Sequence, residues 1–150
     1  GWDDTLFVVF GDHGEAFLEN GRIGHINNLD FYQTSAMLFV HRPGDSKHSD
    51  VTTKTTSHLD VLPTVVETLR RRGVDVDHPD WLRGVDLFSE NFPENRFVYS
   101  ADAQLMNPKN YAMHKGKTVC KMTMDLFDEE CVQILKDGLE GFKRVAGVEQ

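Results

Sequence analysis

The fold is decided by residues 5–15, TLFVVFGDHGE, in which an apolar run leads directly into a polar turn. The run is rich in β-branched and aromatic side chains, the pattern of a central strand buried on both faces of a sheet. Ligands of open α/β sheets bind beyond the carboxyl ends of such strands. The carboxylate of Asp12 and the imidazole of His13 therefore fall where a divalent metal site is expected. The alternative is an Asx turn that carries a surface histidine.

The chain after this turn alternates between loop, strand and helix patterns. A Gly- and Asn-rich loop runs to residue 28, and residues 36–41 (AMLFVH) predict a second buried strand that ends at a Pro-Gly turn. Ser57 then offers a helix cap, and apolar residues at helical spacing predict a helix from Pro63 to Arg72, closed by Gly73. The first 93 residues therefore predict one α/β domain.

The second part of the chain, residues 94–150, predicts a small antiparallel sheet with a helix packed on it. Short strand patterns cover residues 96–100, 111–114, 117–122 and 123–127, with a turn at Lys115-Gly116. A final helix is expected to begin after Asp128. The loop that precedes this sheet is expected to be anchored in the core by four apolar residues, namely Trp81, Leu82, Val85 and Leu87.

Composition excludes several classes of function. The 24 acidic side chains outnumber the 16 basic ones, which gives a net charge of -8, so nucleic acid is not an expected partner. The apolar runs are far shorter than the ~20 residues of a membrane-spanning helix. The only cysteines, Cys120 and Cys131, lack the spacing of a zinc motif, and we favour free thiols over a disulfide because two cysteines make a weak framework.

His25 lies in the same loop, thirteen residues after Asp12. The whole stretch, residues 4–44, resembles the sulfatase family of the alkaline phosphatase superfamily: a strand, a DHGE turn, a Gly-rich loop with a Lys or His, and a second strand that ends in Pro-Gly. Three further blocks resemble the C-terminal part of the sulfatase domain: SHLDVLPTVVETL (57–69), LRGVDLF (82–88) and TMDLFDEE (123–130). The resemblance implies an alkaline-phosphatase-like mixed-sheet sandwich.

The resemblance also implies roles for individual residues. Asp12 and His13 match paired metal ligands, and His25 matches the residue that contacts the sulfate or phosphate group and its leaving oxygen. In related phosphoethanolamine transferases, a His at this spacing can instead help to bind a second metal. The expected ion is calcium in a sulfatase, and zinc or manganese in a transferase. Glu15 is a further candidate, as a carboxylate that orients His13.

The family's nucleophile, a formylglycine in sulfatases, is not part of these motifs, and the chain starts abruptly before its first strand. We therefore expect a fragment that is inactive alone, with the formylglycine in a missing N-terminal half, from a metal-dependent sulfuric ester hydrolase. The alternatives are a phosphoethanolamine or phosphoglycerol transferase and a non-catalytic binding domain. Expected partners are a sulfate or phosphate ester and the missing half, and family members are commonly extracytoplasmic.

The remaining histidines lack ligand spacing and are expected to have surface or capping roles. They are His41, His48, His58, His78 and His114.

Overall fold

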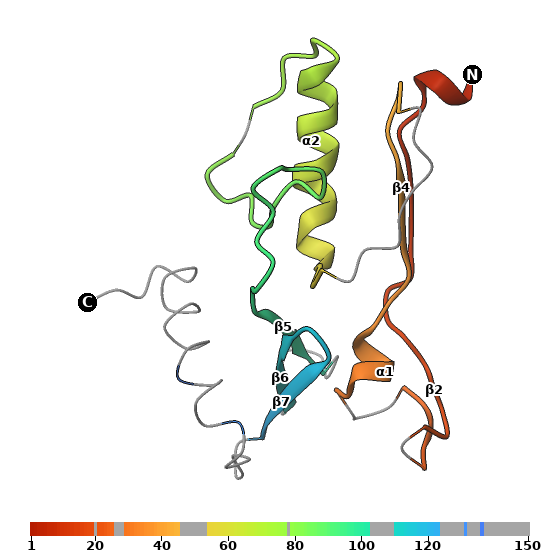
Figure 1. Ribbon diagram of the computed structural model, residues 1–150, viewed down its shortest axis with the longest axis vertical. Helices are drawn as coiled ribbons and strands as arrows, with labels where there is room; N and C mark the ends of the chain where they lie inside the picture. The colour runs from red at the N-terminus through yellow and green to blue at the C-terminus, as the bar shows by residue number, and fades with distance from the viewer. Residues whose placement is uncertain are drawn as a thin grey trace. The chain divides into compact units, whose positions relative to one another are not determined.

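The computed structural model describes residues 1–19, 21–25, 29–45, 54–77, 79–102, 110–123, 131 and 136 (Figure 1). Small antiparallel sheets and short helices make up this part of the chain, so the fold is mixed α/β, as the sequence predicts. No helix in these residues combines the length and the apolarity that crossing a bilayer requires.

The chain divides into two compact units. The first unit combines Gly1–Gly11 with Met37–Glu94, and the second combines Asp12–Ala36 with Asn95–Gln150. The chain crosses from the first unit to the second for the last time after Glu94, and the predicted domain boundary lies between residues 93 and 94. Asp12–Ala36 groups with the second unit rather than with the rest of residues 1–93, and the division into two domains at residue 93 stays a prediction.

In the first unit, a 3-10 helix η1 (Trp2–Asp4) precedes strand β1 (Phe7–Phe10), which pairs antiparallel with β4 (Leu38–His41). Figure 1 shows the two strands side by side. The prediction of a central strand buried on both faces is wrong for the described residues, because Phe7 and Phe10 are 42% and 49% exposed and β4 is the only strand there that pairs with β1. An unbroken apolar run indicates which side chains favour burial, but not which strands cover them.

The predicted helix is present as α2 (Val61–Arg71), preceded by a 3-10 turn η2 (His58–Asp60). A capping box begins it, in which the Ser57 hydroxyl accepts from the Leu59 N–H and the Asp60 carboxylate accepts from the Ser57 N–H. The end is a Schellman motif, since the N–H groups of Gly73 and Val74 donate to carbonyls of the last turn. Local capping signals thus place both ends of this helix within two residues of the prediction.

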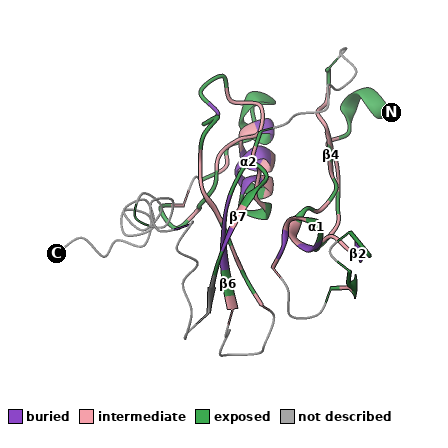
Figure 2. Cartoon of the chain, turned by 60° about the horizontal axis from the view of Figure 1, so that its bottom comes forward, coloured by how far each residue is buried: buried purple, intermediate pink, exposed green. Residues whose placement is uncertain are grey.

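The buried face of α2 includes hydroxyl groups that the apolar pattern does not predict. Thr64 and Thr68 are buried and donate to the carbonyls of Asp60 and Thr64, one turn earlier. Val66 is also buried, whereas Leu62 and Leu69 remain exposed. Figure 2 shows the buried residues along the helix.

Hydrogen bonds to Asp60 and Thr64 hold the loop that follows α2. Trp81 of this loop does not anchor it in the core. Asp60 is fully buried, and its Oδ1 accepts from the Val85 N–H at 2.9 Å, while the Thr64 hydroxyl accepts from the Leu87 N–H at 3.0 Å. The prediction that Trp81 anchors the core is wrong, because this side chain is 67% exposed. The buried polar atoms of α2 need partners and take them from the loop backbone.

The second unit contains the predicted small sheet, with strands β5 (Val98–Ala101), β6 (Asn110–Lys115) and β7 (Thr118–Thr123) in the order β5-β6-β7. All pairs are antiparallel, and the β6–β7 turn centres on Gly116, as predicted. Nearly all of the predicted strand 123–127, and the final helix apart from Cys131 and Lys136, lie outside the described residues. The unit also contains a short hairpin, β2 (Ala16–Phe17) with β3 (Ile23–Gly24), and a one-turn helix α1 (Phe31–Thr34).

Cys120 and Cys131 form a disulfide, which corrects the prediction of free thiols. Their Cα atoms are 5.5 Å apart, and both side chains are buried. This separation suits a disulfide, but it depends on the tertiary arrangement rather than on the spacing of the cysteines in the sequence.

Because His114 in β6 is buried, we expect the free energy of unfolding to depend on pH. It is only 7% exposed, its Nε2 has no hydrogen-bond partner among the described residues, and burial lowers the pKa of its imidazole below the ordinary value of 6.5. The unfolded chain therefore binds more protons than the folded chain between the two pKa values. The free energy of unfolding should be highest above about pH 6.5 and fall as the pH drops towards the lowered pKa.

The measurement is urea unfolding of wild type and His114→Leu at about pH 8 and about pH 5. The variant has no imidazole at this position, so its stability should change less between the two pH values. An equal change in both proteins would show that His114 is not buried in its neutral form.

Candidate functional site

The polar turn that follows β1 is held at its first residue by backbone and histidine contacts. The N–H of Gly11 donates to the Met37 carbonyl at 2.9 Å, and His58 Nε2 lies 2.8 Å from the Gly11 carbonyl oxygen. Because a carbonyl only accepts, this nitrogen of His58 carries a proton. His58 therefore has a structural role, as a donor to the backbone of this turn.

Gly14 allows the turn to pass against the backbone of the α1 segment. Its N–H donates to the Gln33 carbonyl at 2.8 Å, and a Cβ at this position would overlap the carbonyl oxygens of Tyr32 and Ser35. The α1 segment is itself fixed by Asp30, whose side chain accepts from the Gln33 N–H. The glycine of the DHG triplet is thus required by a close approach of two backbones.

Asp12 and His13 present two potential ligand atoms on the same side of this turn. His13 Nδ1 lies 2.7 Å from the Gly14 carbonyl oxygen, so Nδ1 carries the proton and Nε2 keeps its lone pair. Nε2 lies 3.8 Å from Asp12 Oδ1. Two ligands of one ion lie about 3–4 Å apart for metal–ligand distances of 2.0–2.6 Å, and metal-binding histidines commonly donate their other N–H to a carbonyl. The pair therefore fits a divalent ion.

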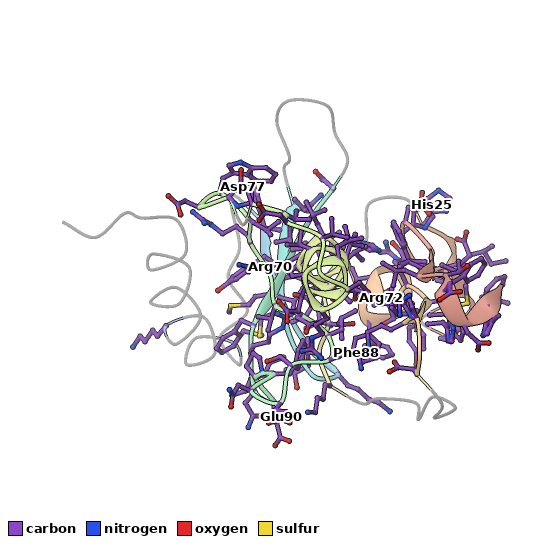
Figure 3. The ribbon with its side chains drawn as sticks, turned by 90° about the horizontal axis from the view of Figure 1, so that it is seen from above. His25, Arg70, Arg72, Asp77, Phe88 and Glu90 are labelled. Carbon is purple, nitrogen blue, oxygen red and sulfur yellow. A yellow bond between two sulfur atoms is a disulfide. The ribbon has the colours of Figure 1, made fainter. Side chains whose placement is uncertain are left out.

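His25 returns to this pair through the β2–β3 hairpin. The hairpin pairs Phe17 with Ile23 and Ala16 with Gly24, so Glu15 and His25 occupy the next position across the two chains. His25 Nδ1 lies 2.9 Å from Glu15 Oε2, and the ring centroids of His13 and His25 are 4.2 Å apart. All three predicted site residues thus lie close together in the second unit, and Figure 3 labels His25. Their chemical roles stay predictions.

Glu15 pairs with His25 and not with His13, the partner considered from the sequence. The pairing of residues across the β2–β3 hairpin could have indicated this contact. However, each strand has only two residues, which is too short to recognise from a single sequence. The other oxygen of Glu15, Oε1, is buried and has no hydrogen-bond partner within the described part of the chain.

The described part of the chain contains no group of three His, Cys, Asp or Glu side chains arranged to hold a metal ion. Of the other histidines, His41 stacks on Trp2 and His114 is buried in β6, while His48 and His78 lie outside the described residues.

Residues 1–70 match the model of the sulfatase family, the family that the sequence motifs resemble. The match covers β1, the GDHGE turn, His25, β4 and nearly all of α2, and it indicates a hydrolase-type enzyme. Neither curated proteins nor solved structures give a significant match to the chain.

Proposed function

We propose that the chain contributes the metal-binding turn and a leaving-group histidine to a metal-dependent sulfuric ester hydrolase. The observation that carries the proposal is the grouping of Asp12, His13 and His25 on one turn and hairpin, within the stretch that matches the sulfatase family. The nucleophile and the remaining metal ligands come from a longer protein, which we call the intact enzyme. Its formylglycine is the expected nucleophile.

Asp12 and His13 are the residues that would hold the ion. Their ligand atoms, 3.8 Å apart, and the hydrogen bond of His13 to the Gly14 carbonyl support this assignment. Calcium is the expected ion in a sulfatase, and zinc or manganese in a transferase. When bound, the ion supplies positive charge beside the transferred group.

His25 acts on the oxygen that leaves with the alcohol. The contact of its ring with His13 supports this role, because His13 is a proposed ligand of the ion that binds the transferred group. A ring N–H at this place donates a hydrogen bond or a proton to the departing oxygen as negative charge develops there.

The contact between His13 and His25 also supports a second candidate, a phosphoethanolamine or phosphoglycerol transferase. Ring centroids 4.2 Å apart leave the two imidazoles near enough for His25 to help bind a second ion. Sulfate ester hydrolysis and phosphoryl-group transfer are therefore the two activities to compare.

We also propose that the first unit is part of an alkaline-phosphatase-like sandwich. The match of residues 1–70 to the sulfatase family supports this architecture.

The test is an assay of the intact enzyme with an aryl sulfate and with a phosphoethanolamine donor. We expect sulfate ester hydrolysis that is lost on chelation and reduced about a hundredfold or more by Asp12→Ala. Asp77→Ala is the matched control, because Asp77 is an exposed aspartate of the first unit (Figure 3). Transfer of the phosphoethanolamine group would favour the second candidate, and binding without either reaction would favour a non-catalytic domain.

A further inference from the structure

Glu15 and His25 form an ion pair within the short hairpin of the candidate site. Glu15 Oε2 lies 2.9 Å from His25 Nδ1, and the two side chains are 37% and 50% exposed. Exposed pairs of this kind contribute little to stability. We therefore consider a role for this pair in the candidate site rather than in the stability of the fold.

The contact fixes which ring nitrogen of His25 carries the proton. An ionised carboxylate only accepts hydrogen bonds, so the atom that faces it, Nδ1, must be the N–H. Nε2 is then the ring nitrogen that Glu15 leaves available. A neutral histidine without such a partner is free to take either tautomer.

The hairpin also restricts how the Glu15 side chain can move. Ala16, the next residue, is fully buried and pairs with Gly24, and a Cβ on Gly24 would lie 3.8 Å from Glu15 Oε1. Oε1 is buried and has no hydrogen-bond partner in the residues that the structure describes. The carboxylate is thus enclosed on one side and meets His25 on the other.

We propose that Glu15 is the positioning residue for His25: it holds the ring with Nδ1 protonated and presents Nε2 to the reacting group. This inference rests on the proposed function for the identity of that group. It holds for both candidate activities, because an acid and a metal ligand would each use Nε2. The carboxylate does not touch the substrate and acts through the imidazole.

The direct test is nitrogen NMR of the histidine rings in alkaline solution, where histidines are neutral. We expect Nδ1 of His25 to give the signal of a protonated ring nitrogen and Nε2 that of an unprotonated one. Glu15→Ala should shift His25 towards the opposite tautomer. Glu15→Gln should largely retain the wild-type tautomer, because its side-chain oxygen still accepts from Nδ1.

Glu67→Gln is the matched control, since Glu67 forms a comparable exposed pair with Arg71 on α2 and lies outside the site. It should leave the His25 signals unchanged. A wild-type His25 protonated on Nε2, or a tautomer that Glu15→Ala does not change, would overturn the inference. If Glu15→Ala does not fold, the wild-type and Glu15→Gln spectra test the inference.

Kinetics of the intact enzyme separate this inference from the proposed function. Glu15→Ala should lower kcat by about tenfold or more with little change in KM, and Glu15→Gln should recover much of the loss. The loss should largely disappear in a His25→Ala background, because Glu15 acts through His25. If His25→Ala itself has no effect, the proposed role of His25 fails while the tautomer result stands. If the Glu15 loss persists without His25, the positioning role fails.

Discussion

His25→Ala in the intact enzyme is expected to lower kcat and kcat/KM together by about a hundredfold or more. This magnitude is typical of a lost general acid or oxyanion donor, whose contribution is made mainly in the transition state. The position of His25 beside the ring of His13 is the structural basis for the expectation. Steady-state kinetics with aryl and alkyl esters measure it.

The leaving group and the metal content distinguish the possible roles of His25. An activated aryl ester needs no protonation of its departing oxygen, so it should lose less rate than an alkyl ester if His25 is the acid. Metal content should then stay near normal, whereas the loss of one metal equivalent would favour the transferase. His41→Ala is a suitable control, because His41 lies in β4 and stacks on Trp2. Unchanged rates and metal content in His25→Ala would remove His25 from the site.

Gly84→Ala is expected to destabilise the first unit by about 3 kcal/mol or more. The φ angle of Gly84 is +96°, a region that side chains with a Cβ disfavour. A Cβ there would also overlap the Leu59 carbonyl oxygen and crowd the Asp60 N–H at 2.9 Å. Because both contacts are backbone atoms of η2, directly before α2, neither can move away without disturbing the helix. Urea unfolding measures the loss.

Gly73→Ala is the matched control for this change. Gly73 also has a positive φ, +79°, but a Cβ there has no heavy atom within 4 Å. Its substitution should cost only the conformational term, about 1 kcal/mol. Equal losses in the free energy of unfolding at the two glycines would show that the close contact with Leu59 does not affect stability.

Helix α2 shows how much a local sequence can predict. Its capping box, its proline in the first turn and its closing glycine all act within a few residues, so Ser57 and Gly73 predict its ends before any tertiary contact is considered. The β6–β7 turn at Gly116 is predictable for the same reason.

The candidate site is partly predictable. The GDHGE turn after an apolar strand, and the His thirteen residues later, single out Asp12, His13 and His25 from the sequence, and the family match covers this stretch. The partner of Glu15 is not predictable, because it depends on the register of a hairpin whose strands have two residues each. One residue of slip would place a different side chain opposite Glu15.

Taken alone, the sequence determines the α/β class, the limits of α2, the antiparallel turn at Gly116 and the residues of the DHG turn, because these follow from signals between near neighbours. Tertiary structure decides that Cys120 meets Cys131, that Trp81 remains exposed and that Glu15 holds His25. Each of these depends on distances between segments that are separated in the chain. Packing and the pairing of buried hydrogen-bonding groups set these distances. The periodicity and composition of the sequence do not specify them for individual residues.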